Sequence, residues 1–273
     1  MPAHAVRCSV PYRVDIAHAG DVVLDRLVEL GALDVERSPG GGIVALMPDG
    51  VAPEHVARVI GVDKVSISPA VGRDAGSVWI LSARPTRIGR LRIVPAHAGA
   101  EPGALRLIDS AAFGTGLHPT TAMCLEAIEE ALQPFTPGAL LDVGTGSGVL
   151  ALAALLMGVP RALGLDIDAE ALRAAAENAR LNALDRRLRL VCGGPDAVAG
   201  TWPLVVANLL AAPLVELAPI LVRRVGHHGR LVLSGIPLSL EPDVDRAYRR
   251  LGMYHARAQS RAGWSALVLQ ASW

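Results

Sequence analysis

The chain has 273 residues, of which 51% are hydrophobic and 19% charged, and its 26 basic and 26 acidic side chains cancel. This length predicts one large or two unequal domains, and the balanced composition excludes an intrinsically disordered chain. A net charge of zero argues against a nucleic-acid binder with a broad basic field, although a local basic groove stays open.

The cysteines and the apolar runs indicate a cytoplasmic protein. Cys8, Cys124 and Cys192 lie far apart without a C-x-x-C pair, which fits free thiols in a reducing compartment and gives no zinc-site spacing. The run from Val149 to Val159 is shorter than the ~20 residues of a membrane span. The first fifteen residues lack the continuous apolar stretch of a secretory signal. We therefore expect no membrane segment and no metal.

Residues 1–70 alternate short strand and helix patterns. Residues 6–14 read as a strand, and the apolar spacing after Asp21 predicts a helix with Gly31 as its C-cap. A strand over 43–47, a short helix over 53–60 and a strand over 64–68 follow. This β-α-β-α-β order predicts a small α+β module of the split β-α-β kind.

A connection and a larger domain follow. Residues 71–104 are rich in Gly, Ala and Pro, with strand-like pieces VWIL and RLRIV, and we interpret them as a linker. From residue 105 to 273, strands, glycine-containing turns and helices repeat in that order. This pattern predicts a parallel sheet that helices cover on both faces.

The segment LLDVGTGSGVL carries the strongest chemical signal. An apolar strand runs into the alternating glycines Gly144, Gly146 and Gly148, and a helix follows. Glycine permits positive φ and close approach of a ligand to the backbone, and the helix N-terminus offers free N–H groups. A tight turn without a ligand has the same pattern, so this segment alone does not establish a binding site.

An acidic residue at the end of the next strand favours a nucleoside cofactor. Asp166 lies 166 − 144 = 22 residues after the first glycine, where a carboxylate can accept hydrogen bonds from both ribose hydroxyls. Capping of the following helix is the alternative role, but Asp168 is better placed for it. The sequence therefore predicts that Asp166 binds a ribose.

Two cofactor classes fit this pattern. The dinucleotide fingerprint G-x-G-x-x-A can be aligned from Gly146 to Ala151, which would suit a dehydrogenase. However, no clear His, Lys or Tyr constellation follows to handle a proton. Asp142 before the glycines and the G-T-G-S-G spacing resemble motif I of class I S-adenosylmethionine-dependent methyltransferases, and we favour that interpretation.

Two further segments flank this motif. Upstream, AFGTGLHPTT places glycines, hydroxyls and a histidine in ten residues, which predicts a cofactor lid followed by a helix that starts at Pro119. Downstream, Asn208 ends the strand LVVAN, so we expect it at the carboxyl edge of the sheet where ligands bind. The Asn-Pro-Pro-Tyr signature for planar amides and base amines is absent, which favours an aliphatic amine acceptor.

Together, AFGTGLHPTT, LLDVGTGSGVLALAAL, ALGLDID, VVANLLAAPLVELAP and GRLVLSGI resemble the PrmA family, the methyltransferases of large-subunit ribosomal protein eleven. The resemblance implies a Rossmann-like seven-stranded class I domain behind a ferredoxin-like, substrate-recognising domain. The chain departs from the family at Asp109-Ser110-Ala111, where members carry Asp-Pro-Gly or Glu-Pro-Gly. By motif position, the resemblance implies S-adenosylmethionine contacts at Thr121, Gly144, Asp166 and Asn208, and we add Phe113, Gly114, Thr115, Gly146 and His118 from the same motifs.

The sequence thus predicts a protein N-methyltransferase that uses S-adenosylmethionine on lysine ε-amines or an N-terminal amine of a large-subunit ribosomal protein. We expect Asn208 to position the acceptor, and His118 is a candidate base although no base is obligatory. Direct nucleic-acid binding is not expected. A small-molecule or other-protein N-methyltransferase and a non-catalytic partner-binding module on the same fold are the alternatives.

Overall fold

The computed structural model describes residues 12–32, 34–37, 42–48, 51–62, 65–69, 85–99, 101–108, 118–133, 136–261 and 263–273. The chain divides into two compact units, Met1–Leu81 and Ser82–Trp273. Each unit is described by itself below.

The N-terminal unit has a four-stranded antiparallel sheet in the order β2-β3-β1-β4, with two helices. Its elements are β1 (Tyr12–Ile16), α1 (Asp21–Glu29), β2 (Asp34–Arg37), β3 (Ile43–Met47), α2 (Pro53–Ile60) and β4 (Val65–Pro69). Alternate residues of β1 are buried, and Leu27, Val56 and Ile60 of the helices join the core. The unit therefore buries an apolar core of its own.

This arrangement contains one strand more than the sequence predicted. The predicted helices and the strands over 43–47 and 64–68 lie within two residues of α1, α2, β3 and β4, whereas residues 6–11 of the first predicted strand lie outside the described residues. Strand β2 was missed because Asp-Val-Glu-Arg offers one apolar residue, which suffices at a sheet edge. The order β-α-β-β-α-β is that of split β-α-β modules, and a ferredoxin-like fold stays a prediction.

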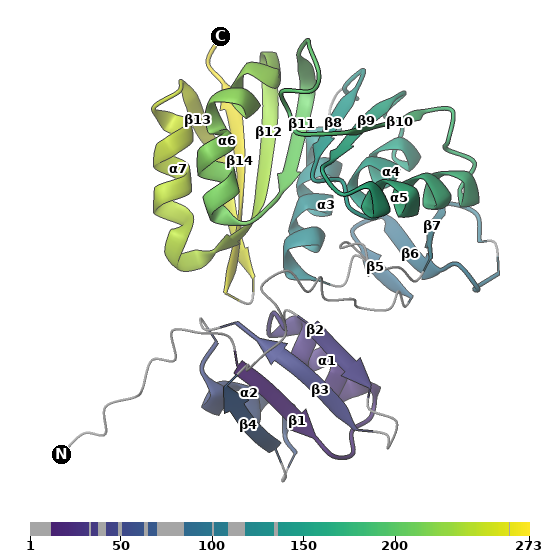
Figure 1. The fold of residues 1–273 in the computed structure, drawn as a ribbon, viewed down its shortest axis with the longest axis vertical. Coiled ribbons are helices and arrows are strands. Elements are labelled where there is room, and N and C mark those ends of the chain that lie inside the picture. Colours follow the sequence, from purple (N-terminus) through teal and green to yellow (C-terminus); the bar gives the residue numbers. More distant parts are fainter. Residues whose placement is uncertain are drawn as a thin grey trace. The chain divides into compact units, whose positions relative to one another are not determined.

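The C-terminal unit is built on a seven-stranded sheet in the order β10-β9-β8-β11-β12-β14-β13 (Figure 1). Strands β8 to β12 run parallel, and β14 runs antiparallel to both of its neighbours. This confirms the predicted seven-stranded class I fold. The strands are β8 (Leu140–Val143), β9 (Ala162–Asp166), β10 (Leu188–Cys192), β11 (Trp202–Asn208), β12 (Val225–Pro237), β13 (Met253–Arg261) and β14 (Trp264–Ala271).

Helices cover both faces of this sheet, as predicted. Neighbouring residues of β8 belong to different apolar cores, with Leu140 on one face and Leu141 on the other, because side chains alternate along a strand. One core contains residues of α3 (Pro119–Ala131), α4 (Val149–Leu156) and α5 (Ala169–Leu181). The other contains residues of α6 (Ala211–Arg224) and α7 (Glu241–Arg249), and a short 3₁₀ turn, Leu238–Leu240, precedes α7.

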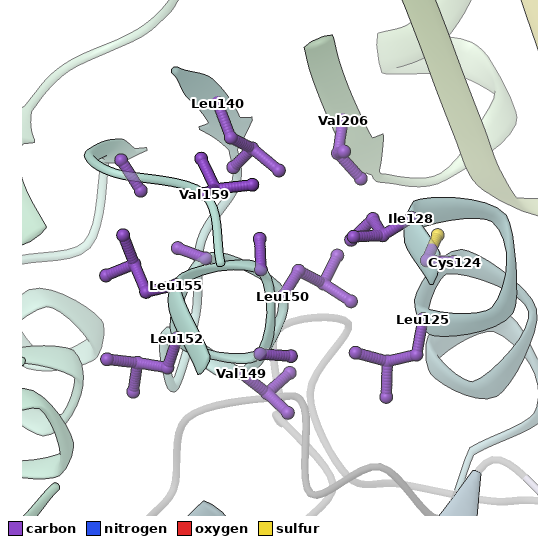
Figure 2. Packing of buried hydrophobic residues seen from close by; sticks show 14 of the residues in the cluster. Cys124, Leu125, Ile128, Leu140, Val149, Leu150, Leu152, Leu155, Val159 and Val206 are labelled. Carbon is purple, nitrogen blue, oxygen red and sulfur yellow. The ribbon is translucent and has the colours of Figure 1, made fainter. Parts of the chain in front are cut away.

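Helix α4 is buried almost completely, because its sequence is apolar on every side. Figure 2 shows that Leu150 lies on the side of α4 that faces α3, whereas Leu152 and Leu155 lie on the other side. The helix begins directly after Gly148, so this packing fixes the glycine turn that precedes it.

The predicted linker is partly wrong. Within residues 71–104, the structure forms β5 (Thr86–Ile88) and β6 (Leu91–Pro95), which continue to β7 (Ala104–Leu107) in a three-stranded sheet. This sheet belongs to the C-terminal unit, and Asn178 of α5 and its C-cap Asn182 hydrogen-bond the backbone at the end of the sheet. The strand-like piece RLRIV coincides with most of β6, whereas the Gly, Ala and Pro residues around it suggested a connection. Residues 70–84, which include VWIL, lie outside the described residues.

Candidate functional site

The strand order reverses between β8 and β11, and the predicted site residues lie at the carboxyl edge beside this point. Strands β8 and β11 pair with each other. On its other side β8 pairs with β9, whereas β11 pairs with β12. In open α/β sheets such a switch point leaves a crevice where ligands bind. The glycine turn follows β8 directly, and Asp166 and Asn208 are the last residues of β9 and β11.

The turn after β8 requires glycine at Gly144. Its φ is +73°, and a Cβ atom there would lie 2.4 Å from Cδ2 of Leu209. The amides of Gly144 and Thr145 both donate to the carbonyl of Leu165, each at 2.8 Å, which ties the turn to the end of β9. The side chain of Leu209 therefore packs directly against the backbone of this turn.

The Asp166 carboxylate is held in place by backbone amides. Oδ2 accepts from the amide of Gly146 at 2.9 Å, and Oδ1 accepts from the amide of Asp168 at 3.0 Å. Each carboxylate oxygen can accept a second hydrogen bond, so both remain competent to bind ribose hydroxyls. Asp168 is the N-cap of α5 and accepts from the amide of Glu170, which confirms that capping belongs to Asp168.

Asp142 is buried beneath the glycine turn. Its Oδ2 accepts from the Thr145 hydroxyl and the Ala151 amide, and Oδ1 has no hydrogen-bond partner among the described residues. Burial raises the pKa of this carboxyl to about 7, against the lowering effect of the two hydrogen bonds, and the Asp166 charge raises it further. Asp142 is therefore a buried acid that titrates near neutrality.

This pKa makes the stability of the protein depend on pH. The folded pKa lies above the ordinary value, so ionisation of Asp142 does not lower the free energy of unfolding below about pH 4. Between about pH 4 and pH 7 the unfolded chain loses this proton first, and the free energy of unfolding falls as pH rises. At about 1.4 kcal/mol per unit, wild type should lose a few kcal/mol relative to Asp142→Asn between these limits. Chemical denaturation of both proteins from pH 4 to 8 measures the difference, and a difference independent of pH would contradict the assignment.

Asn208 and Thr121 come together from positions 87 residues apart. The Asn208 Nδ2 lies 3.5 Å from the Thr121 hydroxyl, at the limit of a hydrogen bond, and Thr121 is fully buried on the first turn of α3. The Asn208 Oδ1 is buried and has no partner in the described part of the chain. A buried acceptor without a donor is costly, so this atom points to a ligand that supplies an N–H or O–H.

The backbone after Asn208 packs closely against Gly235, which the sequence analysis did not identify as a site residue. The Leu209 amide donates to the Ser234 carbonyl at 3.0 Å. Gly235 has φ +82°, and a Cβ there would lie 2.2 Å from the Leu209 carbonyl oxygen. The available signal was its place in GRLVLSGI, at the end of the strand beside β11.

His118 lies at the N-cap of α3 and is buried. Its Nδ1 accepts from the Thr120 amide at 3.4 Å and lies 2.7 Å from the Thr120 hydroxyl, and burial lowers its pKa to about 4. The ring is therefore neutral and a weak base near pH 7, which argues against the candidate base role. Whether His118 contacts the cofactor stays a prediction.

Trp264 is a second residue that the sequence did not indicate. Its indole meets the His118 ring edge-on at a centroid distance of 5.2 Å, and its buried Nε1 has no partner among the described residues. A lone tryptophan at the start of a C-terminal strand gives no functional pattern in the sequence. Of the predicted lid, Phe113, Gly114 and Thr115 lie outside the described residues.

The described residues contain no cluster of three metal-ligating side chains, and no helix among them is long and apolar enough to span a membrane. The groups at the switch point suit a nucleoside cofactor instead. They supply a carboxylate with free lone pairs at Asp166, a half-buried glycine backbone at Gly144 and an unpaired buried acceptor at Asn208. These residues fit S-adenosylmethionine, which carries both a ribose and an amino-acid portion.

Comparisons with known proteins identify relatives. A family model described as ribosomal protein L11 methyltransferase (PrmA) matches residues 59–272. The ribosomal protein L11 methyltransferase of Pelobacter propionicus is 37% identical over 229 residues, 81% of this chain and 73% of that protein. The one from Ectopseudomonas mendocina is 42% identical over 226 residues, with the same two shares.

A solved structure shows the same similarity. The ribosomal protein L11 methylase from Lactobacillus delbrueckii subsp. bulgaricus superposes with a TM-score of 0.62 at 31% sequence identity, covering 68% of this chain and 97% of that one.

Proposed function

The chain belongs to the family of ribosomal protein L11 methyltransferases, and on this premise we propose that it methylates amino groups of ribosomal protein L11, at lysine ε-amines or the N-terminus. It is a class I methyltransferase with S-adenosylmethionine as methyl donor. The observation that carries the proposal is the unpaired, buried Asn208 Oδ1 at the switch point, since an amine supplies the N–H donor that this oxygen lacks.

We assign the donor site to the residues around the glycine turn. S-adenosylmethionine, when bound, supplies a methyl group activated by its sulfonium. Asp166 would accept hydrogen bonds from the ribose hydroxyls, and the Gly144 backbone would leave room for the cofactor. We add Thr121 and Gly146 to the donor site, as their motif positions imply.

Asn208 would orient the acceptor. Its Oδ1 accepts an N–H of the amine, which aims the nitrogen lone pair at the methyl carbon, and such alignment is a large part of catalysis for an activated substrate. The amine must be neutral to react. The apolar, partly buried side chain of Leu209 would favour loss of its proton, because low polarity disfavours an ammonium ion.

Blocking the amines of the substrate tests this proposal. The full-length enzyme is incubated with labelled S-adenosylmethionine and either purified L11 or L11 whose amines have been acetylated. We expect label in native L11 and none in the acetylated protein. Equal label in both would contradict amine methylation, and label only in small amines would favour the small-molecule alternative.

The ribosomal substrate also favours a cytoplasmic location.

Replacing Asp166 should weaken donor binding. Asp166→Ala removes a charged acceptor, so we expect S-adenosylmethionine affinity to fall by about 1.5–3 kcal/mol by calorimetry. Asp168→Ala is the matched control, because it removes a neighbouring carboxylate that caps α5. The control should lose about 1 kcal/mol of stability and keep its donor affinity. Unchanged affinity in folded Asp166→Ala would contradict the ribose assignment.

His118 should not set the pH dependence of the reaction. With a pKa of about 4, it does not titrate where the acceptor amine becomes neutral. His118→Asn preserves a side chain suited to the N-cap, so kcat/KM should rise with pH along the same curve as in wild type. The profiles are measured from pH 6 to 9. Loss of the pH dependence in the variant would restore His118 as the base.

A further inference from the structure

A basic groove lies at the amino edge of the seven-stranded sheet, opposite the candidate site. Its volume is about 520 Å³, and it is lined where β8, β9, β10 and β11 begin. A five-residue strand spans roughly 16 Å, so a ligand here would not touch the donor site at the carboxyl edge. The inference is therefore independent of the proposed function.

Arginine side chains concentrate positive charge in this groove. Arg161, Arg186 and Arg189 line it and are exposed, and their guanidinium groups make no hydrogen bond or ion pair with the described residues. A fourth lining residue, Arg187, donates to the carbonyls of Pro160, Leu155 and Val159, so its guanidinium is fixed at the wall. No acidic side chain is among the described lining residues.

The groove also has an apolar side. The half-buried side chains of Trp202 and Leu163 line it beside the arginines. Guanidinium groups bind phosphate oxygens through paired N–H donors, and an indole offers a face on which a nucleobase stacks. The volume lies within the range of small-molecule sites.

We propose that this groove binds a nucleoside phosphate, with Arg161, Arg186 and Arg189 contacting the phosphates and Trp202 contacting the base. A simple anion would use only the arginines, and an apolar ligand would leave them unpaired. A mononucleotide uses both kinds of surface.

Calorimetry on the full-length protein tests the proposal with guanosine 5′-diphosphate as probe, after S-adenosylhomocysteine has saturated the donor site. We expect wild type to bind the probe and the double variant Arg161→Glu/Arg189→Glu to bind it at least about tenfold more weakly. Arg250→Glu is the control, because Arg250 is exposed on the described surface and does not line the groove. It should keep wild-type affinity. Each variant should still bind S-adenosylhomocysteine, which shows that it is folded.

Four results would overturn the proposal. One is no binding by wild type, and another is an equal loss in Arg250→Glu and the double variant. The third is equal affinity for guanosine diphosphate and pyrophosphate, which would leave Trp202 without a role. An oligoribonucleotide that binds the groove far more tightly than the mononucleotide would assign it to RNA instead.

Discussion

A chain that begins at Ser82 is expected to bind S-adenosylmethionine with the affinity of the full-length protein and to methylate L11 at least about a hundredfold more slowly. The described donor residues all lie in Ser82–Trp273, a compact unit with its own apolar cores. We propose that the N-terminal unit docks the substrate, and misalignment of an acceptor by about 1 Å is enough for a hundredfold loss.

Two measurements separate the possible outcomes for this truncation. Calorimetry with S-adenosylhomocysteine shows whether the shortened chain folds and binds the cofactor. Label transfer to L11 shows whether docking is lost. Efficient methylation of L11 by the truncated chain would contradict a substrate-reading role for the N-terminal unit. The truncation tests the N-terminal unit in particular, because the family model matches only from residue 59 and leaves most of Met1–Leu81 unmatched.

Gly235→Ala is expected to reduce methyl transfer by about a hundredfold while most of the protein stays folded. The added Cβ would lie 2.2 Å from the carbonyl oxygen and 2.7 Å from the carbonyl carbon of Leu209, both backbone atoms. The Leu209 backbone must therefore shift, and Asn208 moves with it. Initial rates at saturating donor and L11 measure the effect.

Gly103→Ala is the matched control. Gly103 has φ +78°, close to the +82° of Gly235, but nothing lies within 4 Å of its would-be Cβ among the described atoms. In both variants a non-glycine residue in the left-handed conformation should lower the free energy of unfolding by about 1–2 kcal/mol. Only Gly235→Ala should also displace the backbone of Leu209 and, with it, Asn208. Equal rates in the two variants would show that Gly235 is structural only.

The sequence predicted the parts of the site that lie on single motifs. The glycine turn follows an apolar strand, and Asp166 and Asn208 each end one, so their places at the carboxyl edge result from the alternation of strands and helices. The capping role of Asp168 was also predictable, because it depends on local geometry.

Contacts between distant segments could not be predicted in the same way. Three such contacts depend on how helices and strands pack. They are the contact of Thr121 with Asn208, that of His118 with Trp264, and the close approach of Gly235 to the Leu209 backbone. The three-stranded sheet β5-β6-β7 was predicted only in part, because the sequence indicated a strand-like piece at β6 but not the sheet. The short strands lack a clear period, and their pairing and the hydrogen bonds between Asn182, the C-cap of α5, and the backbone of Arg106 define the sheet.

Intact-mass spectrometry of L11 incubated with S-adenosylmethionine and either wild type or Asn208→Ala tests the central claim most directly. We expect wild type to add whole methyl groups to L11 and Asn208→Ala to add them at least about a hundredfold more slowly. Peptide mapping should locate the added mass on amines. Two results would contradict the account. One is L11 that stays unmodified although the wild-type enzyme is active, and the other is methylation of L11 at equal rates by wild type and Asn208→Ala.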